Sequence, residues 1–202
     1  MDRRGLIVSG LSLIVAAKAN QAFAQEAAPP ERGPAGPNYP PAETYSRDEL
    51  VNKVSDFFGV TAEAAGAIIT RAFRDNGQPT GYISGEEGSA ALTVGLRYGK
   101  GLLYMKNRQP VTVYWQGPSV GFDVGGNASR SFTLCYNLQD PDELFQRFPG
   151  VEGSGYFIAG LGLNYQRADE ITLAPIRAGV GLRLGANIGY LAYTRKRHIL
   201  PF

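Results

Sequence analysis

The sequence predicts a mainly β domain of the α+β class: a small closed or nearly closed β-barrel with a pair of N-terminal helices packed on it. Two observations lead to this fold class. From Tyr82 onward, apolar and polar residues alternate with a period of two through several short segments separated by turn residues, which is typical of barrels and sandwiches. Before Tyr82, apolar residues recur at helical spacing.

The first residues have the organisation of a secretory signal. Arg3 and Arg4 precede an apolar stretch over residues 5–17, and Ala22-Phe23-Ala24 matches the small-residue cleavage pattern. The apolar stretch is shorter than the roughly 20 residues that a membrane-spanning helix needs. We therefore expect a signal peptide over residues 1–24, cleavage before Gln25 and export of the chain.

Residues 25–44 are rich in proline and contain almost no large apolar side chain. Such a segment buries too little surface to offset the entropy of ordering, so we expect an extended, disordered tether. The folded unit then covers residues 45–202, which is a normal size for a single domain.

Two helices are expected at the start of this domain. Ser46 and Glu49 form a capping box, apolar residues follow at helical spacing, and Gly59 ends the first helix. Thr61 begins a second helix, which Asp75-Asn76-Gly77 terminates. Both helices present an apolar side, which we expect to pack on the sheet.

Alternation then predicts the strands. A third, short helix interrupts them, with Asp140 as its N-cap, Pro141 in its first position and Phe148 near its end. Gly117-Pro118 is interpreted as a corner between two strands. The expected strands cover residues 91–98, 111–115, 120–124, 157–165 and 176–188, with turns at Asn107, Gly125-Gly126-Asn127 and Ala168-Asp169.

The strand at residues 176–188 carries glycine repeatedly on one face, at Gly179, Gly181 and Gly185. Repeated glycine weakens a strand but permits a sharp bend or a close approach of other atoms. We take it as evidence for strong curvature, and hence for closure of the barrel.

Arg177 and Arg183 share that glycine face. They are candidates for binding an anionic headgroup. The alternative is that they pair with acids such as Asp123 or Glu170, or meet solvent.

Several kinds of chemistry are excluded or weakened by residue type. Cys135 is the single cysteine and His198 the single histidine, so we expect no intrachain disulfide, no metal site and no cofactor. Gly117-Pro118-Ser119-Val120-Gly121 matches the nucleophile elbow of serine hydrolases, with Asp169 and His198 in the matching order. The elbow requires a helix after the serine, whereas strand alternation follows here, so no catalytic residue is predicted.

The charge balance excludes nucleic acid as a partner. The whole chain has a net charge of +2, and removal of a signal that contains Arg3, Arg4, Lys18 and Asp2 leaves equal numbers of basic and acidic residues. A neutral mature chain lacks the positive surface that nucleic-acid binding needs.

Four sequence runs carry a resemblance to a known family. They are Gly85-Glu86-Glu87, Gly95-Leu96-Arg97-Tyr98-Gly99, the segment from Trp115 to Asn127, and the segment from Ala174 to Arg183. Together they resemble the envelope integrity protein A (EipA) family over residues 45–202. The Trp115-Gln116-Gly117-Pro118-Ser119 run is more distantly similar to the SYLF lipid-binding domain.

The resemblance implies a protein of the Gram-negative periplasm that supports envelope integrity. Because the residues offer no catalytic constellation, we expect it not to be an enzyme, and we expect a monomer. Its expected partner is a lipid, a glycan or an envelope protein. The alternatives are a small outer-membrane β-barrel and, more remotely, a serine hydrolase that uses Ser119. The candidate ligand-binding residues are Arg97, Tyr114, Trp115, Asp123, Arg177 and Arg183.

Overall fold

A computed structural model describes residues 41–91, 94–120, 129–178 and 189–197. Its helices are α1 (Arg47–Phe58), α2 (Ala62–Asn76) and the short 3₁₀ helix η1 (Pro141–Leu144). Its strands are β1 (Gly81–Ala91), β2 (Val94–Met105), β3 (Val111–Val120), β4 (Ser129–Tyr136), β5 (Arg147–Pro149), β6 (Tyr156–Ile158), β7 (Leu161–Leu163), β8 (Gln166–Ala168), β9 (Ile171–Ala178) and β10 (Tyr190–Thr194).

Both long helices begin and end where their capping residues predict. The Ser46 hydroxyl accepts a hydrogen bond from the Glu49 amide, and the Glu49 carboxylate accepts one from the Ser46 amide at 2.7 Å. Gly59 ends α1 with a φ of 68°, in the left-handed region that glycine adopts without strain. The Thr61 hydroxyl caps α2 by accepting a hydrogen bond from the Ala64 amide, and Gly77 follows the last residue of α2.

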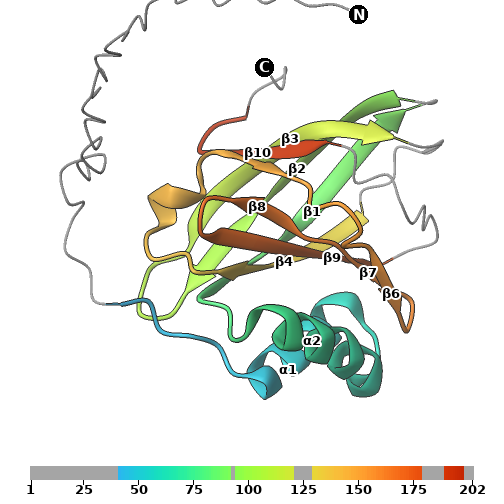
Figure 1. The fold of residues 1–202 in the computed structure, drawn as a ribbon, viewed down its shortest axis with the longest axis vertical. Helices are drawn as coiled ribbons and strands as arrows, with labels where there is room; N and C mark the ends of the chain where they lie inside the picture. The colour runs from blue at the N-terminus through green and yellow to red at the C-terminus, as the bar shows by residue number, and fades with distance from the viewer. Residues whose placement is uncertain (1–40, 92–93, 121–128, 179–188, 198–202) are drawn as a thin grey trace, which may run out of the picture. The chain divides into compact units, whose positions relative to one another are not determined.

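Within the described residues, ten strands form one antiparallel sheet in the order β5-β10-β3-β2-β1-β4-β9-β7-β6, with β8 also paired to β9 (Figure 1). The sheet curls until β5, at one end of this order, meets β8. Gly150, directly after β5, forms an antiparallel bridge to Gln166 in β8, and the Val151 amide donates to the Tyr165 carbonyl at 2.9 Å. The expected barrel with an N-terminal helical pair is therefore confirmed.

The sheet separates two hydrophobic cores. The outer core lies between the helices and the sheet, and the inner core fills the barrel. The central strands supply both, so β4 and β9 are buried on both faces through most of their length. The outer core includes Leu50, Val54, Ile68, Ile69, Tyr82, Phe132, Leu134, Tyr136, Leu163 and Ile176. The inner core includes Ile83, Leu103, Val113, Trp115, Cys135, Leu144, Phe148, Leu173, Leu191 and Tyr193.

Glycine on the inner face permits the curl. Gly85 and Gly101 lie opposite each other in the β1–β2 pair. A Cβ atom on Gly85 would overlap the Lys100 carbonyl, and one on Gly101 would lie 2.5 Å from the Ser84 carbonyl. The two strands therefore approach more closely and bend more sharply than side chains would allow.

The strand expected at residues 91–98 is wrong in its boundaries. β1 ends at Ala91 and β2 begins at Val94, and the two strands run antiparallel with Ala91 opposite Gly95. Cross-strand partners face the same side of the sheet, so inward-facing and outward-facing residues keep the same odd or even numbering from β1 to β2. The alternation of the sequence therefore does not show where the chain reverses.

The expected corner at Gly117-Pro118 is also wrong. β3 runs through both residues, and Pro118 pairs with Leu96. Proline is accommodated because β10 pairs with β3 only as far as Gln116, so that side of β3 has no paired strand at Pro118 among the described residues. Gly117 is required because a Cβ atom there would overlap the Tyr190 carbonyl of the chain entering β10.

The third helix is shorter than expected. Asp140 and Glu143 form the predicted capping box, but the segment is a single 3₁₀ turn, and Phe148 belongs to β5. The end of the strand predicted at residues 120–124, the turn at residues 125–127 and the glycine face at residues 179–188 lie outside the described residues. So do the expected signal peptide and most of the tether.

Candidate functional site

The inner face of the barrel holds a buried carboxylate with charged partners. Glu87, in β1, is 4% exposed. Its Oε1 atom accepts a hydrogen bond from Arg177 Nε, and its Oε2 atom accepts one from Arg177 Nη2 at 3.3 Å. Trp115 Nε1 also donates to Oε2 at 3.2 Å, and Arg97 Nε lies 3.8 Å from Oε1. Bidentate contact with one arginine and a second arginine nearby compensate the carboxylate's loss of water.

The pairing register of β1, β2 and β3 brings Glu87 and Trp115 together. Gly99 lies opposite Glu87 in β1 on one side and opposite Trp115 in β3 on the other. A Cβ atom on Gly99 would overlap the Trp115 indole. The glycine therefore leaves the space through which the indole reaches towards Glu87.

The electrostatics keep this cluster ionised. Burial by itself raises the pKa of Glu87, but the charges of Arg177 and Arg97, with the hydrogen bonds from Arg177 and Trp115, outweigh it and hold the pKa below its usual range. Arg177 also donates to Asn164 Oδ1 at 2.8 Å. A carboxylate that is ionised and saturated with donors is a poor proton donor or base, so the geometry favours a structural role for this cluster.

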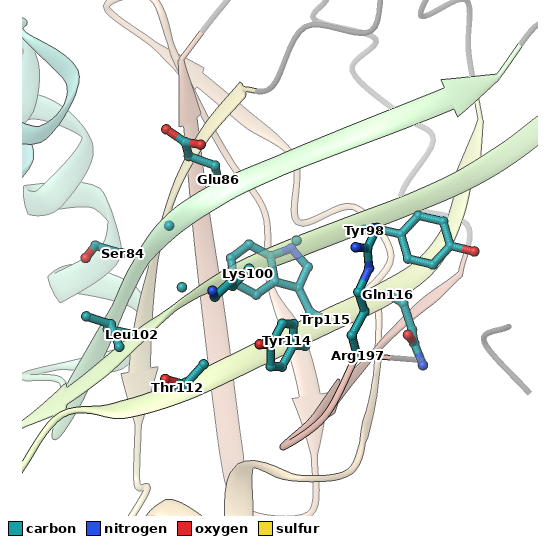
Figure 2. A pocket seen from close by; sticks show the side chains of 13 residues that line it. Ser84, Glu86, Tyr98, Lys100, Leu102, Thr112, Tyr114, Trp115, Gln116 and Arg197 are labelled. Atoms are coloured by element: carbon teal, nitrogen blue, oxygen red, sulfur yellow. The ribbon is translucent and has the colours of Figure 1, made fainter. Parts of the chain in front are cut away.

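The outer face of the same strands is open. A groove of about 600 Å³ lies across β1, β2 and β3 (Figure 2). Tyr114 and Lys100 lie opposite each other across the β2–β3 pair, and the Lys100 ammonium is 5.8 Å from the Tyr114 ring centre. Arg197, from the segment after β10, reaches the same groove. The other side chains that line it are Ser84, Glu86, Tyr98, Leu102, Thr112, Trp115 and Gln116.

The structure divides the predicted site residues between these two faces. Arg97, Trp115 and Arg177 meet at Glu87 inside the barrel. Tyr114 lies in the outer groove. Asp123 and Arg183 lie outside the described residues.

The structure pairs Arg177 with Glu87, an acid that the sequence interpretation did not suggest, whereas the suggested Asp123 lies outside the described residues. Glu87, Lys100 and Arg197 were not predicted as site residues. Adjacent residues in a strand face opposite sides, and Glu86 lines the outer groove whereas Glu87 is buried. This parity is the signal that points to Glu87, although it does not identify the partner.

The hydrolase alternative finds no support in the backbone around Ser119. The residue lies within β3, paired with Gly95, and not at a turn from a strand into a helix. His198 lies outside the described residues. Among the residues that the structure describes, no cluster of histidine, cysteine, aspartate and glutamate has the geometry of a metal site.

Comparison with known proteins gives a family. Residues 43–202 match the family described as envelope integrity protein A. The chain belongs to the envelope integrity protein A family. A crystal structure of a β-barrel-like, uncharacterised protein from Brucella abortus is 47% identical to it, with a TM-score of 0.72. That alignment covers 79% of this chain and 99% of the other. No curated protein matches.

Family membership supports an envelope-related role, and the similar crystal structure supports the barrel. In the part of the chain that the structure describes, no helix is both long and apolar enough to cross a membrane.

Proposed function

We propose that this chain is a periplasmic protein that supports envelope integrity by binding an envelope component, without catalysing a reaction. The observation that carries the proposal is the contrast between the two faces of β1–β3. Inside the barrel, apolar side chains fill the space together with Glu87 and its hydrogen-bond donors Arg177 and Trp115. Outside, a groove with aromatic, cationic and hydroxyl side chains is open. Such a mixture of apolar surface and a few polar groups is typical of binding sites.

The periplasmic location is part of the proposal. It is supported by the family, by Arg3 and Arg4 before the apolar stretch, and by the Ala22-Phe23-Ala24 pattern. N-terminal sequencing of the protein from its host should begin at Gln25. A mature chain that begins at Met1 would contradict the location.

The outer-membrane alternative is disfavoured by the outer face of the sheet. Lipid-facing strands need a continuous apolar band, whereas Glu86 and Lys100 lie exposed on that face and α1 and α2 cover another part of it. Carbonate washing of envelopes should therefore release the protein. Retention in the washed membrane would favour the outer-membrane barrel.

The binding role is tested by capture from native material. Protein purified from its own envelope without detergent should carry a lipid, glycan or protein that mass spectrometry detects, and washed envelope fragments should retain the purified mature protein. A chain that carries nothing and is not retained would contradict the binding function.

A further inference from the structure

We propose that the outer groove binds an acidic glycan, a polysaccharide that carries carboxylate or phosphate groups. This inference rests on the proposed binding function and identifies the class of ligand. It is carried by two tyrosines, Lys100 and several hydroxyl or amide side chains on one face of three adjacent strands, together with Arg197 from the segment after β10.

The tyrosines provide a surface for sugar rings. Tyr98 lies opposite Gln116, and Tyr114 lies opposite Lys100, so the two rings are diagonal neighbours on β2 and β3. Both are half-buried, so the sheet restricts their conformations before a ligand arrives. Aromatic side chains combine a large apolar face with a polar edge, which suits the apolar C–H face of a sugar ring and the hydroxyl groups around it.

The cations favour an acidic ligand. Lys100 is exposed beside Tyr114, and Arg197 is exposed at the end of the groove near Tyr98 and Gln116 (Figure 2). Glu86 is the one acidic side chain among the lining residues. Charge-assisted hydrogen bonds from lysine and arginine to carboxylate or phosphate are about twice as strong as neutral ones.

The remaining lining residues suit hydroxyl-rich ligands better than an acyl chain. Ser84, Thr112 and Gln116 provide donors and acceptors, and Leu102, at 37% exposed, is the large aliphatic side chain in the groove. An acyl chain needs an enclosed apolar space, and the inner core already fills the barrel with its own side chains.

The test uses the mature protein and two matched probes. Oligogalacturonates supply carboxylated sugar rings, and their methyl esters supply the same rings without the charge. Trp115 is the single tryptophan and lines the groove, so its emission reports binding, with calorimetry as an independent measurement. We expect the acidic oligomer to bind at least about tenfold more tightly than the ester, because the ester lacks the charge that strengthens hydrogen bonds from Lys100 and Arg197.

Groove variants locate the site. Lys100→Gln and Tyr114→Ala should each weaken binding by about tenfold, whereas Tyr114→Phe should bind like the wild type because the ring remains. The matched controls are Lys53→Gln on α1 and Phe157→Ala on β6, where the side chain is 48% exposed. Neither control should change the affinity. A thermal melt of each variant confirms folding.

The outcomes separate this inference from the proposed function. Equal binding of acid and ester, preference for anionic phosphatidylglycerol vesicles over oligosaccharides, or unchanged affinity in Tyr114→Ala would overturn the acidic-glycan inference. If envelope fragments still retain the protein in that case, the binding function stands with another ligand. If envelope fragments do not retain the wild type, the proposed function itself fails.

Discussion

The two faces of β1–β3 use the same kinds of side chain for different purposes. On the inner face, the buried Glu87 accepts hydrogen bonds from the buried Trp115 and from Arg177, whose side chain is 20% exposed. On the outer face, Glu86, Lys100 and Tyr114 line an open groove. Neighbouring residues in the chain, Glu86 with Glu87 and Tyr114 with Trp115, are thus assigned to opposite faces by the strand alternation.

The difference shows that a charged residue's surroundings decide its role. A carboxylate held by a bidentate arginine inside the barrel contributes to the fold, whereas an exposed cation beside the half-buried ring of Tyr114 can contact a ligand in the open groove. The pairs of adjacent residues provide matched variants that test this division.

The largest expected effect is on stability, from the inner carboxylate. Glu87→Gln should lower the free energy of unfolding by about 3 to 5 kcal/mol, because Arg177, whose side chain is only 20% exposed, would lose its counter-charge. Glu86→Gln is the control, and it should change the free energy by less than about 0.5 kcal/mol because that side chain is exposed. Urea denaturation of both variants measures the difference. Equal effects would contradict the separation of the two faces.

A second effect on stability comes from the glycine between Glu87 and Trp115. Gly99→Ala should destabilise by about 1 to 3 kcal/mol, because the added methyl group displaces the indole and overpacks the inner core. Gly88→Ala in β1 is the matched control, since nothing lies within 4 Å of a Cβ atom there. Thermal melts should show a lower midpoint for Gly99→Ala alone. A midpoint for Gly99→Ala as high as that of Gly88→Ala would mean that the indole moves without cost.

The buried Glu87 carboxylate should also make the stability of the folded state depend on pH. The pKa of Glu87 is lowered in the folded state, so the ionised carboxylate stabilises the fold. This contribution to the free energy of unfolding is complete above the ordinary glutamate pKa of 4.5 and is lost as the pH falls through the lower pKa of the folded state. The wild type should lose more stability below pH 4.5 than Glu87→Gln does. The capping carboxylates Glu49 and Glu63 also have lowered pKa values, but they are common to both proteins.

Unfolding free energies measured from neutral pH into the acid range give this comparison, and Glu86→Gln should retain the wild-type slope. Parallel curves for wild type and Glu87→Gln would contradict the assignment. A carbon-13 titration of the Glu87 carboxyl group in the wild type tests the same shift without a variant.

The smallest expected effect belongs to Ser119. Ser119→Ala should cost at most about 1 kcal/mol, the usual contribution of one hydrogen bond, because the residue is a strand position opposite Gly95. A fluorophosphonate probe should leave the wild type unlabelled while it labels an added serine hydrolase. Stoichiometric labelling of Ser119 would restore the enzyme alternative.

Local sequence signals determined the helices and the fold class. Ser46, Glu49 and Gly59 fix both ends of α1 through contacts within a few residues, and Asp140 with Glu143 fixes the start of η1. Alternation with a period of two assigned the faces of the strands, since it depends only on backbone geometry. These features needed no knowledge of which strands are neighbours.

Tertiary structure alone decided the strand ends and the partners. The alternation passes in phase from β1 to β2, and Gly117 is explained only by the approach of Tyr190. Arg177 reaches Glu87 across 90 positions in the sequence because β9, β4 and β1 are neighbours in the sheet. A sequence pattern records which way a side chain faces, but the identity of the group opposite depends on strand order and register, which long-range packing sets.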